Sequence, residues 1–318
     1  MSESFPYPSQ ETSVGAFRQT YVDVGEGNHT LLCVHGNPTW SFYYRSVIER
    51  FSDRFRVIAI DHVGCGRSDK PARDEFDYCL SAHRDNVVGL IGQLDLQNVT
   101  LVAHDWGGAI GLAALLKQKA RFEGIVLLNT GAFPPPYLPW RIAACRIPFF
   151  GPFAVRGFNA FARAAITMAM SRNRMNEHAK TGLLQPYDSW ANRVAIDAFV
   201  RDIPMKPSHP TYATLKQLEA DLPTLADLPS ALIWGMKDWC FRPECLRRFE
   251  SVWPNAIVTE IADAGHYVLE DATDEVLSAM ETFLAMHGDQ RVPDPADEVA
   301  SEQGQSDQAQ TGQGTADG

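Results

Sequence analysis

The stretch Val102-Ala103-His104-Asp105-Trp106-Gly107-Gly108 decides how the rest of the chain is interpreted. The aliphatic run Val99–Val102 leads into it, and the Ala- and Leu-rich run Ala109–Leu116 leads out, which predicts a strand, a sharp turn and a helix. Asp105 stands at the apex, with a small residue two places on either side, as the tight turn of a nucleophile elbow requires. A carboxylate there is ionised at neutral pH and can attack carbon to form an ester. The alternative is that Asp105 only caps the helix, because Asp is a favoured N-cap residue.

Length and composition indicate a globular α/β protein. The chain has 318 residues, of which 45% are hydrophobic, enough for one large α/β domain with an insertion or for two ordinary domains. No apolar run approaches the roughly 20 residues of a membrane span, and the polar segment 1–12 lacks the core of a secretory signal, so we expect a cytoplasmic protein. Six scattered cysteines and nine histidines form no metal-binding pattern, so we predict reduced thiols, no metal and no cofactor.

The negative charge is concentrated at the C-terminus. The net charge is −11, and residues 288–318 hold seven acidic residues against Arg291, which leaves −5 on the rest of the chain. A mildly acidic body without a basic stripe argues against nucleic acid as a partner. The segment 288–318 has few large apolar residues, so we predict that it is a disordered acidic tail.

Strands and helices are expected to alternate along the first half of the chain and again near its end. This pattern predicts a doubly wound, mostly parallel sheet. We expect an opening hairpin from the alternating residues 17–24 and the turn at Gly25–Asn28. The expected strands are 17–24, 30–35, 56–60, 99–102, 122–129, 231–234 and 257–261, and the expected helices are 41–50, 81–94, 109–116, 243–252 and 273–286.

The alternation breaks between Phe133 and Asp221. This part carries three consecutive prolines, no strand signal, and helical stretches at 158–170 and 187–200. It is therefore expected to be a helical lid, inserted into a core formed by residues 1–132 and 222–287. Its aromatic residues line a tunnel for alkyl chains, pack on a partner or form ordinary core; they are Trp140, Phe149, Phe150, Phe153, Phe158 and Phe161.

Loops after the strands of an open α/β sheet bind ligands, and two of them carry partners for Asp105. Asp238 follows one strand and His266 follows the next, so nucleophile, acid and base occur in the order of an α/β-hydrolase with Asp in place of Ser. His266 would activate water against an ester, and Asp238 would hold its tautomer. Asp263 is the weaker candidate for the acid because it precedes the turn at Gly265. Asn129, after an earlier strand, carries no charge.

The loop His35-Gly36-Asn37-Pro38 is a turn before a helix or half of an oxyanion hole. In the second interpretation the backbone N–H groups of Asn37 and Trp106 stabilise an oxyanion, and their side-chain N–H groups converge on a departing anion. The glycine-rich loop 64–68 matches no nucleotide-binding pattern.

Several motifs together resemble the haloalkane dehalogenase family of α/β-hydrolases. They are His35-Gly36-Asn37-Pro38-Thr39-Trp40, residues 61–71, His104-Asp105-Trp106-Gly107-Gly108 and Gly265-His266-Tyr267, and the match runs from about 17 to 286. The resemblance implies that Asp105 is the nucleophile and His266 the base, and that Asn37 and Trp106 stabilise the halide. Asp238 as the acid, with Asn129 where some members keep Glu, resembles the third subfamily.

The lid is similar to that of the cis-β-lactone decarboxylases of bacterial long-chain olefin biosynthesis. The similar segments are 129–134, 158–161, 186–193, 202–204 and 238–241, whereas 171–176 departs from the pattern. This resemblance implies conversion of a hydrophobic β-lactone to a cis-alkene and CO2, within a complex of olefin-pathway enzymes. The alternatives are haloalkane hydrolysis, epoxide hydrolysis assisted by Tyr187 and Tyr212, and a binding module without catalysis.

Overall fold

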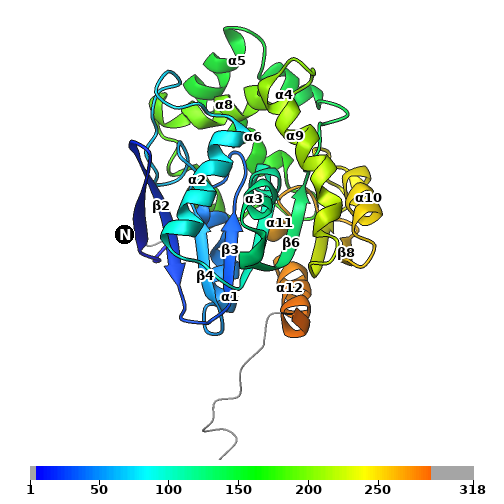
Figure 1. The fold of residues 1–318 in the computed structure, drawn as a ribbon. Coiled ribbons are helices and arrows are strands. Elements are labelled where there is room, and N and C mark those ends of the chain that lie inside the picture. Colours follow the sequence, from blue (N-terminus) through cyan, green and yellow to red (C-terminus); the bar gives the residue numbers. More distant parts are fainter. Residues whose placement is uncertain (1–4, 288–318) are drawn as a thin grey trace, which may run out of the picture. The chain divides into compact units, whose positions relative to one another are not determined.

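The computed structural model describes residues 5–287, and its centre is an eight-stranded sheet (Figure 1). The strands lie in the order β1-β2-β4-β3-β5-β6-β7-β8. β1 and β2 are antiparallel to their neighbours, and the strands from β4 to β8 are parallel, which confirms the predicted sheet. The strands are β1 (Ser9–Val14), β2 (Phe17–Val24), β3 (Thr30–Val34), β4 (Arg56–Ile60), β5 (Val99–Asp105), β6 (Phe122–Thr130), β7 (Ser230–Gly235) and β8 (Ile257–Ile261).

The hairpin predicted across Gly25–Asn28 does not form, and the chain instead opens with a hairpin of β1 and β2. β1 and β2 are joined at Gly15 and Ala16, and β1 lies in the segment that the sequence suggested was a polar leader. Gly25–Asn28 instead leads from β2 to β3, and β4 lies between these two strands in the sheet. The sequence does not predict β1, because five of its six residues are polar. It therefore lacks the alternation of apolar and polar residues that marks a half-buried strand.

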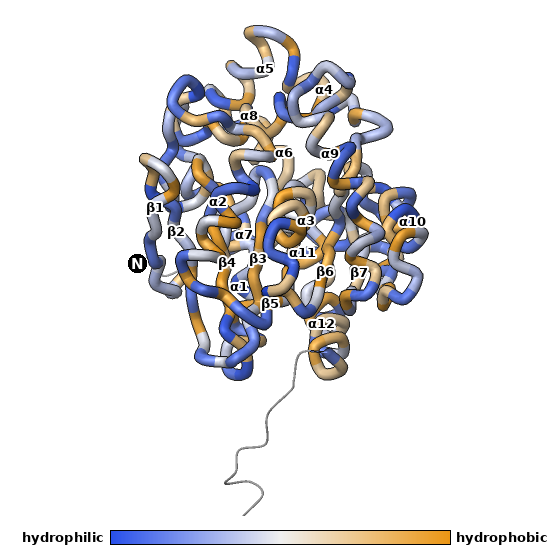
Figure 2. Tube along the Cα trace, in the orientation of Figure 1, coloured by the Kyte–Doolittle hydropathy of each residue, from blue (hydrophilic) through white to orange (hydrophobic). Residues whose placement is uncertain are grey.

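The central strands are buried on both faces, as their continuous apolar sequences predict. All residues of β3 and β5 are buried, and the tube along β3 is coloured as hydrophobic in Figure 2. Alternate residues serve different cores: Leu32 packs with α2 and α3 on one face, while Leu31 packs with α1 and α12 on the other. The sheet is therefore packed between two layers of helices, which fix the positions of its strand ends.

Helices cover both faces of the sheet and the end where its parallel strands terminate (Figure 1). The helices outside the lid are η1 (Ser41–Tyr44), α1 (Arg45–Phe51), α2 (Leu80–Gln93), α3 (Trp106–Lys117), η2 (Lys119–Arg121), η5 (Leu222–Leu225), α10 (Pro243–Val252), α11 (Val268–Asp271) and α12 (Thr273–His287). The helices between β6 and η5 are α4 (Trp140–Ala144), α5 (Phe150–Pro152), η3 (Phe153–Gly157), α6 (Ala160–Met168), α7 (Glu177–Leu184), η4 (Ala191–Arg193), α8 (Val194–Asp202) and α9 (Pro210–Asp221).

The segment from Phe133 to Asp221 contains helices and no strand. Its helices α4, α5, α6 and α8 lie above the sheet in Figure 1, whereas α9 packs beside α2 and α3. The helix expected at 158–170 is α6, which is shorter at both ends. The predicted first residue of the helix expected at 187–200 is wrong, because α8 begins at Val194, after the short turn of η4. α7 and α9 were not anticipated. We call residues 133–221 the lid; its bounds and those of the core stay a prediction.

No helix among residues 5–287 is long and apolar enough to cross a membrane. The predicted disordered tail, 288–318, lies outside the described residues.

Candidate active site

Asp105 lies at the end of β5, where the chain turns sharply into α3. Its backbone has a φ of +55°, a region that costs a non-glycine residue free energy and is typical of strained functional turns. Gly107 is required here, because a Cβ at that position would lie 1.9 Å from the carbonyl oxygen of Val34. The hydroxyl of Thr130, at the end of β6, donates to the carbonyl oxygen of Asp105 and holds the turn. The capping alternative is wrong, since the Asp105 side chain makes no helix-capping hydrogen bond.

The Asp105 carboxylate is buried and faces the loop after β3. The backbone N–H of Asn37 donates to its Oδ1 at 2.7 Å. A Cβ on Gly36 would lie 2.1 Å from the same oxygen, so only glycine lets the loop come this close. Burial raises the pKa of Asp105 above its ordinary value, while His266 and the backbone N–H groups of Asn37 and Trp106 oppose the rise. The carboxylate is thus little hydrated, which favours nucleophilic attack.

His266 and Asp238 complete a chain of three side chains that starts at Asp105. Nε2 of His266 lies 3.6 Å from Oδ2 of Asp105, and its Nδ1 lies 2.9 Å from Oδ2 of Asp238. All three side chains are buried. Asp263, the competing candidate for the acid, is instead exposed and pairs with Arg172. The structure therefore brings together the three side chains predicted from the strand ends and leaves Asp263 outside.

The charge state of His266 depends on its two carboxylates. Burial lowers the pKa of His266, but attraction to Asp238, the hydrogen bond that Nδ1 donates to Asp238 and attraction to Asp105 outweigh it, so the pKa is raised overall. If Asp105 became an uncharged ester, one of these attractions would vanish. The pKa of His266 would then fall during the reaction, and the imidazole would lose its proton more readily.

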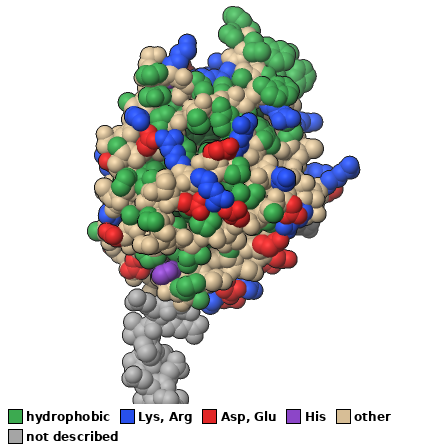
Figure 3. All heavy atoms as spheres, turned by 90° about the vertical axis from the view of Figure 1, so that its right-hand side faces the viewer, with side chains coloured by type: hydrophobic (Ala, Val, Ile, Leu, Met, Phe, Trp, Pro, Cys, Tyr) green, Lys and Arg blue, Asp and Glu red, His purple; other side chains and the backbone are tan. Residues whose placement is uncertain are grey.

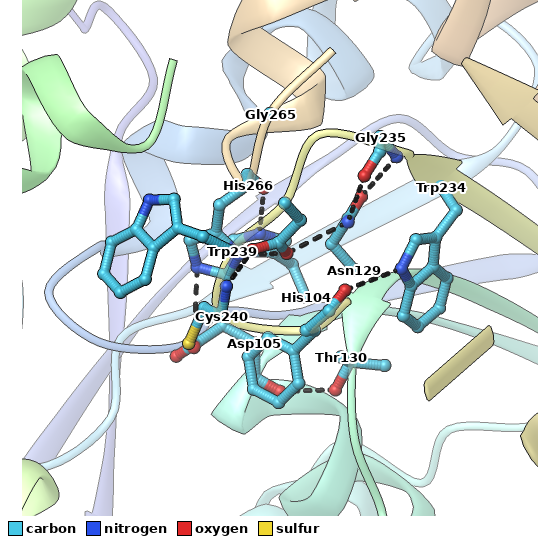
Figure 4. Close-up of polar contacts among 12 residues, drawn as sticks. His104, Asp105, Asn129, Thr130, Trp234, Gly235, Trp239, Cys240, Gly265 and His266 are labelled. Atoms are coloured by element: carbon cyan, nitrogen blue, oxygen red, sulfur yellow. Dashed lines mark hydrogen bonds and ion pairs between the residues drawn. The ribbon is translucent and has the colours of Figure 1, made fainter. Parts of the chain in front are cut away.

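Asn129, at the end of β6, links the acid to the sheet (Figure 4). Its Nδ2 donates to Oδ2 of Asp238 at 3.0 Å and to the carbonyl oxygen of Gly235 at 3.1 Å, and its Oδ1 accepts the N–H of Gly235 at 2.8 Å. The N–H of Cys240 donates to the other oxygen of Asp238 at 2.6 Å. The sequence indicates only that Asn129 cannot serve as the acid and that it stands where some members keep Glu. Its place at a strand end is the signal that could have predicted this positioning contact.

Two further residues outside the predicted set fix the loop that carries His266. Nε2 of His104, the residue before Asp105, lies 2.9 Å from the carbonyl oxygen of His266. The buried carboxylate of Asp271 accepts the N–H of Gly265 at 2.7 Å and the N–H groups of Ser171, Arg172 and Asn173 in the lid. Asp271 therefore ties the base loop to the lid. The lid segment it holds is part of 171–176, the stretch that departs from the family pattern.

The side chains of Asn37 and Trp106 both line the cavity above Asp105. Nδ2 of Asn37 donates to the carbonyl oxygen of Ile196 in α8 at 3.3 Å, which orients the amide. An amide nitrogen carries two hydrogens, so one donor is left for a ligand. Asn37 thus couples the loop after β3 to the lid, a contact that the sequence did not indicate.

The cavity has a volume of about 470 Å³ and lies between the strand ends and the lid. Asp105 and His266 are at its floor, and its walls are largely apolar. The lid contributes, among others, Trp140, Ile142, Phe150, Phe161, Met168 and Val200. Tyr187 and Tyr212 do not line it, and the hydroxyl of Tyr187 donates to the carbonyl oxygen of Thr39. The arrangement needed for epoxide hydrolysis by these two tyrosines is therefore contradicted.

The six lid aromatics separate into two groups. Trp140, Phe150 and Phe161 line the cavity, whereas Phe149, Phe153 and Phe158 do not and are exposed. The interpretation as ordinary core is wrong for the five exposed residues, whereas Phe161 also packs against the core. Among residues 5–287 there is also no cluster of three or more His, Cys, Asp or Glu side chains that is suited to a metal ion.

Comparison with known proteins agrees with this geometry. Residues 29–273 match the family model described as the alpha/beta hydrolase fold, which covers most of the chain. The chain belongs to the α/β-hydrolase family. Within this family it is 40% identical, over 83% of its length and 84% of the relative, to a cis-3-alkyl-4-alkyloxetan-2-one decarboxylase of Shewanella oneidensis. The motif-based resemblance is thereby confirmed.

Other α/β-hydrolases similar to the chain are dehalogenases. Haloalkane dehalogenase 2 of Mycobacterium tuberculosis is 32% identical over 87% of this chain and 94% of the relative. The crystal structure of the haloalkane dehalogenase DatA from Agrobacterium tumefaciens superposes with a TM-score of 0.80 at 23% identity, covering 90% of this chain and 99% of that one. The latter likeness establishes the fold.

Proposed function

We propose that this α/β-hydrolase is a β-lactone decarboxylase that converts a cis-dialkyl β-lactone to a cis-alkene and CO2, with Asp105 as nucleophile. The observation that carries the proposal is a buried carboxylate at a strained elbow, facing an apolar cavity wide enough for alkyl chains. The 40% identity to a decarboxylase of this kind, against 32% to a dehalogenase, supports the choice of substrate.

In the first step, Asp105 attacks the saturated ring carbon that is bonded to the ring oxygen, not the carbonyl carbon. A bond forms between Oδ2 and this carbon, the bond from the carbon to the ring oxygen breaks, and the freed oxygen becomes part of a carboxylate. Asn37 and Trp106, which line the cavity beside Asp105, supply N–H donors for this carboxylate. Release of the strain of a four-membered ring favours the step.

In the second step, the new carboxylate leaves as CO2. Its electron pair forms the double bond, the bond to Asp105 breaks, and the carboxylate of Asp105 is restored. Inversion in the first step and departure from opposite faces in the second convert a cis-lactone to a cis-alkene. His266 as a cation, which attraction to Asp238 continues to favour while Asp105 is an ester, stabilises the charge that returns to Asp105.

The products distinguish this route from attack at the carbonyl carbon. Carbonyl attack would give an acyl-enzyme and an alkoxide, and hydrolysis by water activated at His266 would release a 3-hydroxy acid without CO2. Of these two routes, only attack at the saturated ring carbon gives an alkene and CO2.

The second candidate function is hydrolysis of haloalkanes, favoured by the similarity to haloalkane dehalogenase 2. Asp105 would displace halide toward Asn37 and Trp106, and neutral His266 would activate water to hydrolyse the ester. The two reactions need opposite protonation states of His266, which makes their pH profiles different.

The test is to incubate the purified protein with a cis-dialkyl β-lactone and to measure alkene and CO2, with a bromoalkane in parallel to measure halide. We expect alkene and CO2 in equal amounts, and neither with Asp105→Asn, a matched variant that keeps the shape of the side chain. Rapid halide release without alkene would reverse the assignment. A 3-hydroxy acid as the sole product would reject decarboxylation, and retained configuration at its alcohol carbon would place the attack at the carbonyl carbon.

A cytoplasmic location and assembly with other enzymes of olefin biosynthesis are also proposed, from the resemblance alone. Co-purification of the chain with a condensing enzyme and a lactone synthetase from its own cell would test the assembly.

A further inference from the structure

The tip of the lid carries an exposed apolar surface of unusual extent. We define the lid tip as Ile147, Phe149, Phe150, Phe153 and Phe158, whose exposed fractions are 50, 92, 60, 58 and 64%. Figure 3 shows hydrophobic side chains gathered at this end of the molecule, where α5 lies in Figure 1. A contiguous exposed patch of aromatic residues is typical of an interaction site.

The backbone of the lid tip adds to the cost of this exposure. Phe149 is the most exposed of these residues and has a φ of +62°, a region unfavourable for a bulky side chain. The ring of Phe149 thus projects from a strained position into solvent. Both the exposure of the ring and the positive φ are unfavourable for the protein alone in water. They are explained when an apolar phase receives the ring.

The charge around the lid tip is positive in a protein that is negative overall. Residues 124–171 contain four arginines and no Asp, Glu or Lys, whereas the whole chain has a net charge of −11. Arg141 stacks over Trp140, and Arg156 stacks over Trp190, so two cations lie on exposed aromatic rings beside the tip. The acid that attracts Arg156 is Asp197, which is buried and already paired with Arg73 and Arg201.

The lid tip is continuous with the substrate cavity. Trp140 and Phe150 both line the cavity, yet they are 73 and 60% exposed. Side chains that contact both the cavity and the solvent mark its mouth. An apolar substrate that enters or leaves at this mouth passes over the lid tip.

We propose that the lid tip inserts into the surface of an anionic lipid bilayer and exchanges substrate and product with it. The aromatic rings enter the boundary between headgroups and acyl chains, and the arginines contact lipid phosphates. The purpose of this contact rests on the proposed function, because a dialkyl β-lactone and its alkene dissolve in lipid far better than in water. The contact itself is independent of the reaction.

The experiment is sedimentation of the full chain with vesicles of phosphatidylcholine and phosphatidylglycerol in equal amounts. We expect binding that is about tenfold weaker, or more, to vesicles of phosphatidylcholine alone and in high salt. Phe149→Ser and Phe153→Ser should each weaken binding by about tenfold, because each removes an apolar ring from the lipid. Met286→Ser is the matched control: Met286 is 58% exposed, like Phe153, but lies in α12 at the far end of the molecule.

The outcomes separate this proposal from the proposed function. Phe149 and Phe153 do not line the cavity, so turnover of a short, water-soluble dialkyl lactone should be unchanged in both variants. Vesicle binding without lactone turnover would keep the docking surface and reject the reaction. Absence of vesicle binding, or equal loss in Met286→Ser, would overturn the docking surface. Loss of a dimer in Phe149→Ser, seen by analytical ultracentrifugation without vesicles, would assign the lid tip to contacts between copies instead.

Discussion

The floor of the cavity consists of buried side chains at the ends of strands, whereas its mouth consists of exposed side chains of the lid. At the floor, Asp105, Asp238 and His266 are buried at the ends of β5, β7 and β8 and are held by hydrogen bonds from neighbouring strands. At the mouth, Trp140 and Phe150 project from short helical turns of the lid into solvent. The floor is fixed by a parallel sheet, and the mouth by a segment with no strand.

This difference separates chemistry from substrate choice. A carboxylate held in place at a strained elbow serves any reaction that begins with attack on carbon, whether the leaving group is a halide or a lactone oxygen. The lid decides which molecules reach it and from which phase they come. Changes at the floor should therefore alter the rate of reaction, and changes at the lid should alter access to the site.

Replacement of Asp105 by Asn gives the largest expected effect. Turnover should fall by about 10⁴-fold or more, since the nucleophile is removed. The fold should become more stable at neutral pH, because burial raises the pKa of Asp105 and ionisation is therefore unfavourable in the folded state. The gain should shrink as the pH falls below the raised pKa and should vanish below the ordinary pKa of an Asp side chain, where Asp105 is protonated in both the folded and the unfolded state. Urea unfolding at several pH values measures it, and a variant that is less stable at neutral pH would contradict this account.

Replacement of Asp238 by Asn should have the next largest effect, lowering turnover of the lactone by about 10²-fold or more through loss of the correct His266 geometry. In the wild type, lactone turnover should fall at low pH as Asp105 is protonated and at high pH as His266 loses its proton. Asp238 contributes most to the raised pKa of His266. In the variant this pKa should therefore be lower, and the loss of activity at high pH should begin at a lower pH than in the wild type.

The check is the pH profile of kcat. Haloalkane hydrolysis would show the reverse dependence, with activity rising as His266 becomes neutral. A wild-type lactone profile that rises through the pKa of His266 would therefore reject the role given to the imidazolium.

The sequence predicted the floor because parallel strands end at one edge of a sheet. Once strands were expected at 99–102, 231–234 and 257–261, the residues that follow them had to meet, and the structure brings Asp105, Asp238 and His266 together. The sheet topology carries this information over long separations in sequence. Local hydrophobic patterns are enough to find such strands.

The contacts around the floor and the arrangement of the lid needed the structure. Asn129 reaches Asp238 only through the register between β6 and β7, and a single residue of slip would turn its side chain to the other face. In the lid, a run of aromatic residues is compatible with core, cavity wall or surface. Which of these applies depends on the direction of short helices, which no periodic pattern encodes.

Replacement of Asn129 by Ala tests whether the floor depends on its support. The variant removes a donor to Asp238 and leaves the backbone groups of Gly235 without two side-chain partners. We expect kcat to fall by about tenfold with little change in KM, because loss of one buried hydrogen bond costs about 1–3 kcal/mol. A Thr130→Val variant is a useful comparison, since it loosens the elbow itself. If Asn129→Ala raised KM and left kcat unchanged, Asn129 would not act by positioning the acid.

Replacement of Asp271 by Asn should have the smallest effect on the reaction, and it joins the two regions. Asp271 accepts N–H groups from the base loop at Gly265 and from Ser171, Arg172 and Asn173 of the lid, and an amide nitrogen in place of one oxygen would face these donors. We expect the free energy of unfolding to fall by about 2 kcal/mol. KM for a long-chain lactone should rise several-fold more than KM for a short one, since the lid contacts the alkyl chains and the floor does not.

Arg172→Ala, which removes exposed ion pairs from the same segment, is the control and should change stability by less than about 1 kcal/mol. Equal changes in KM for both chain lengths would show that Asp271 acts on the base loop alone, so that the lid and the floor are coupled through some other contact, such as that between Asn37 and Ile196.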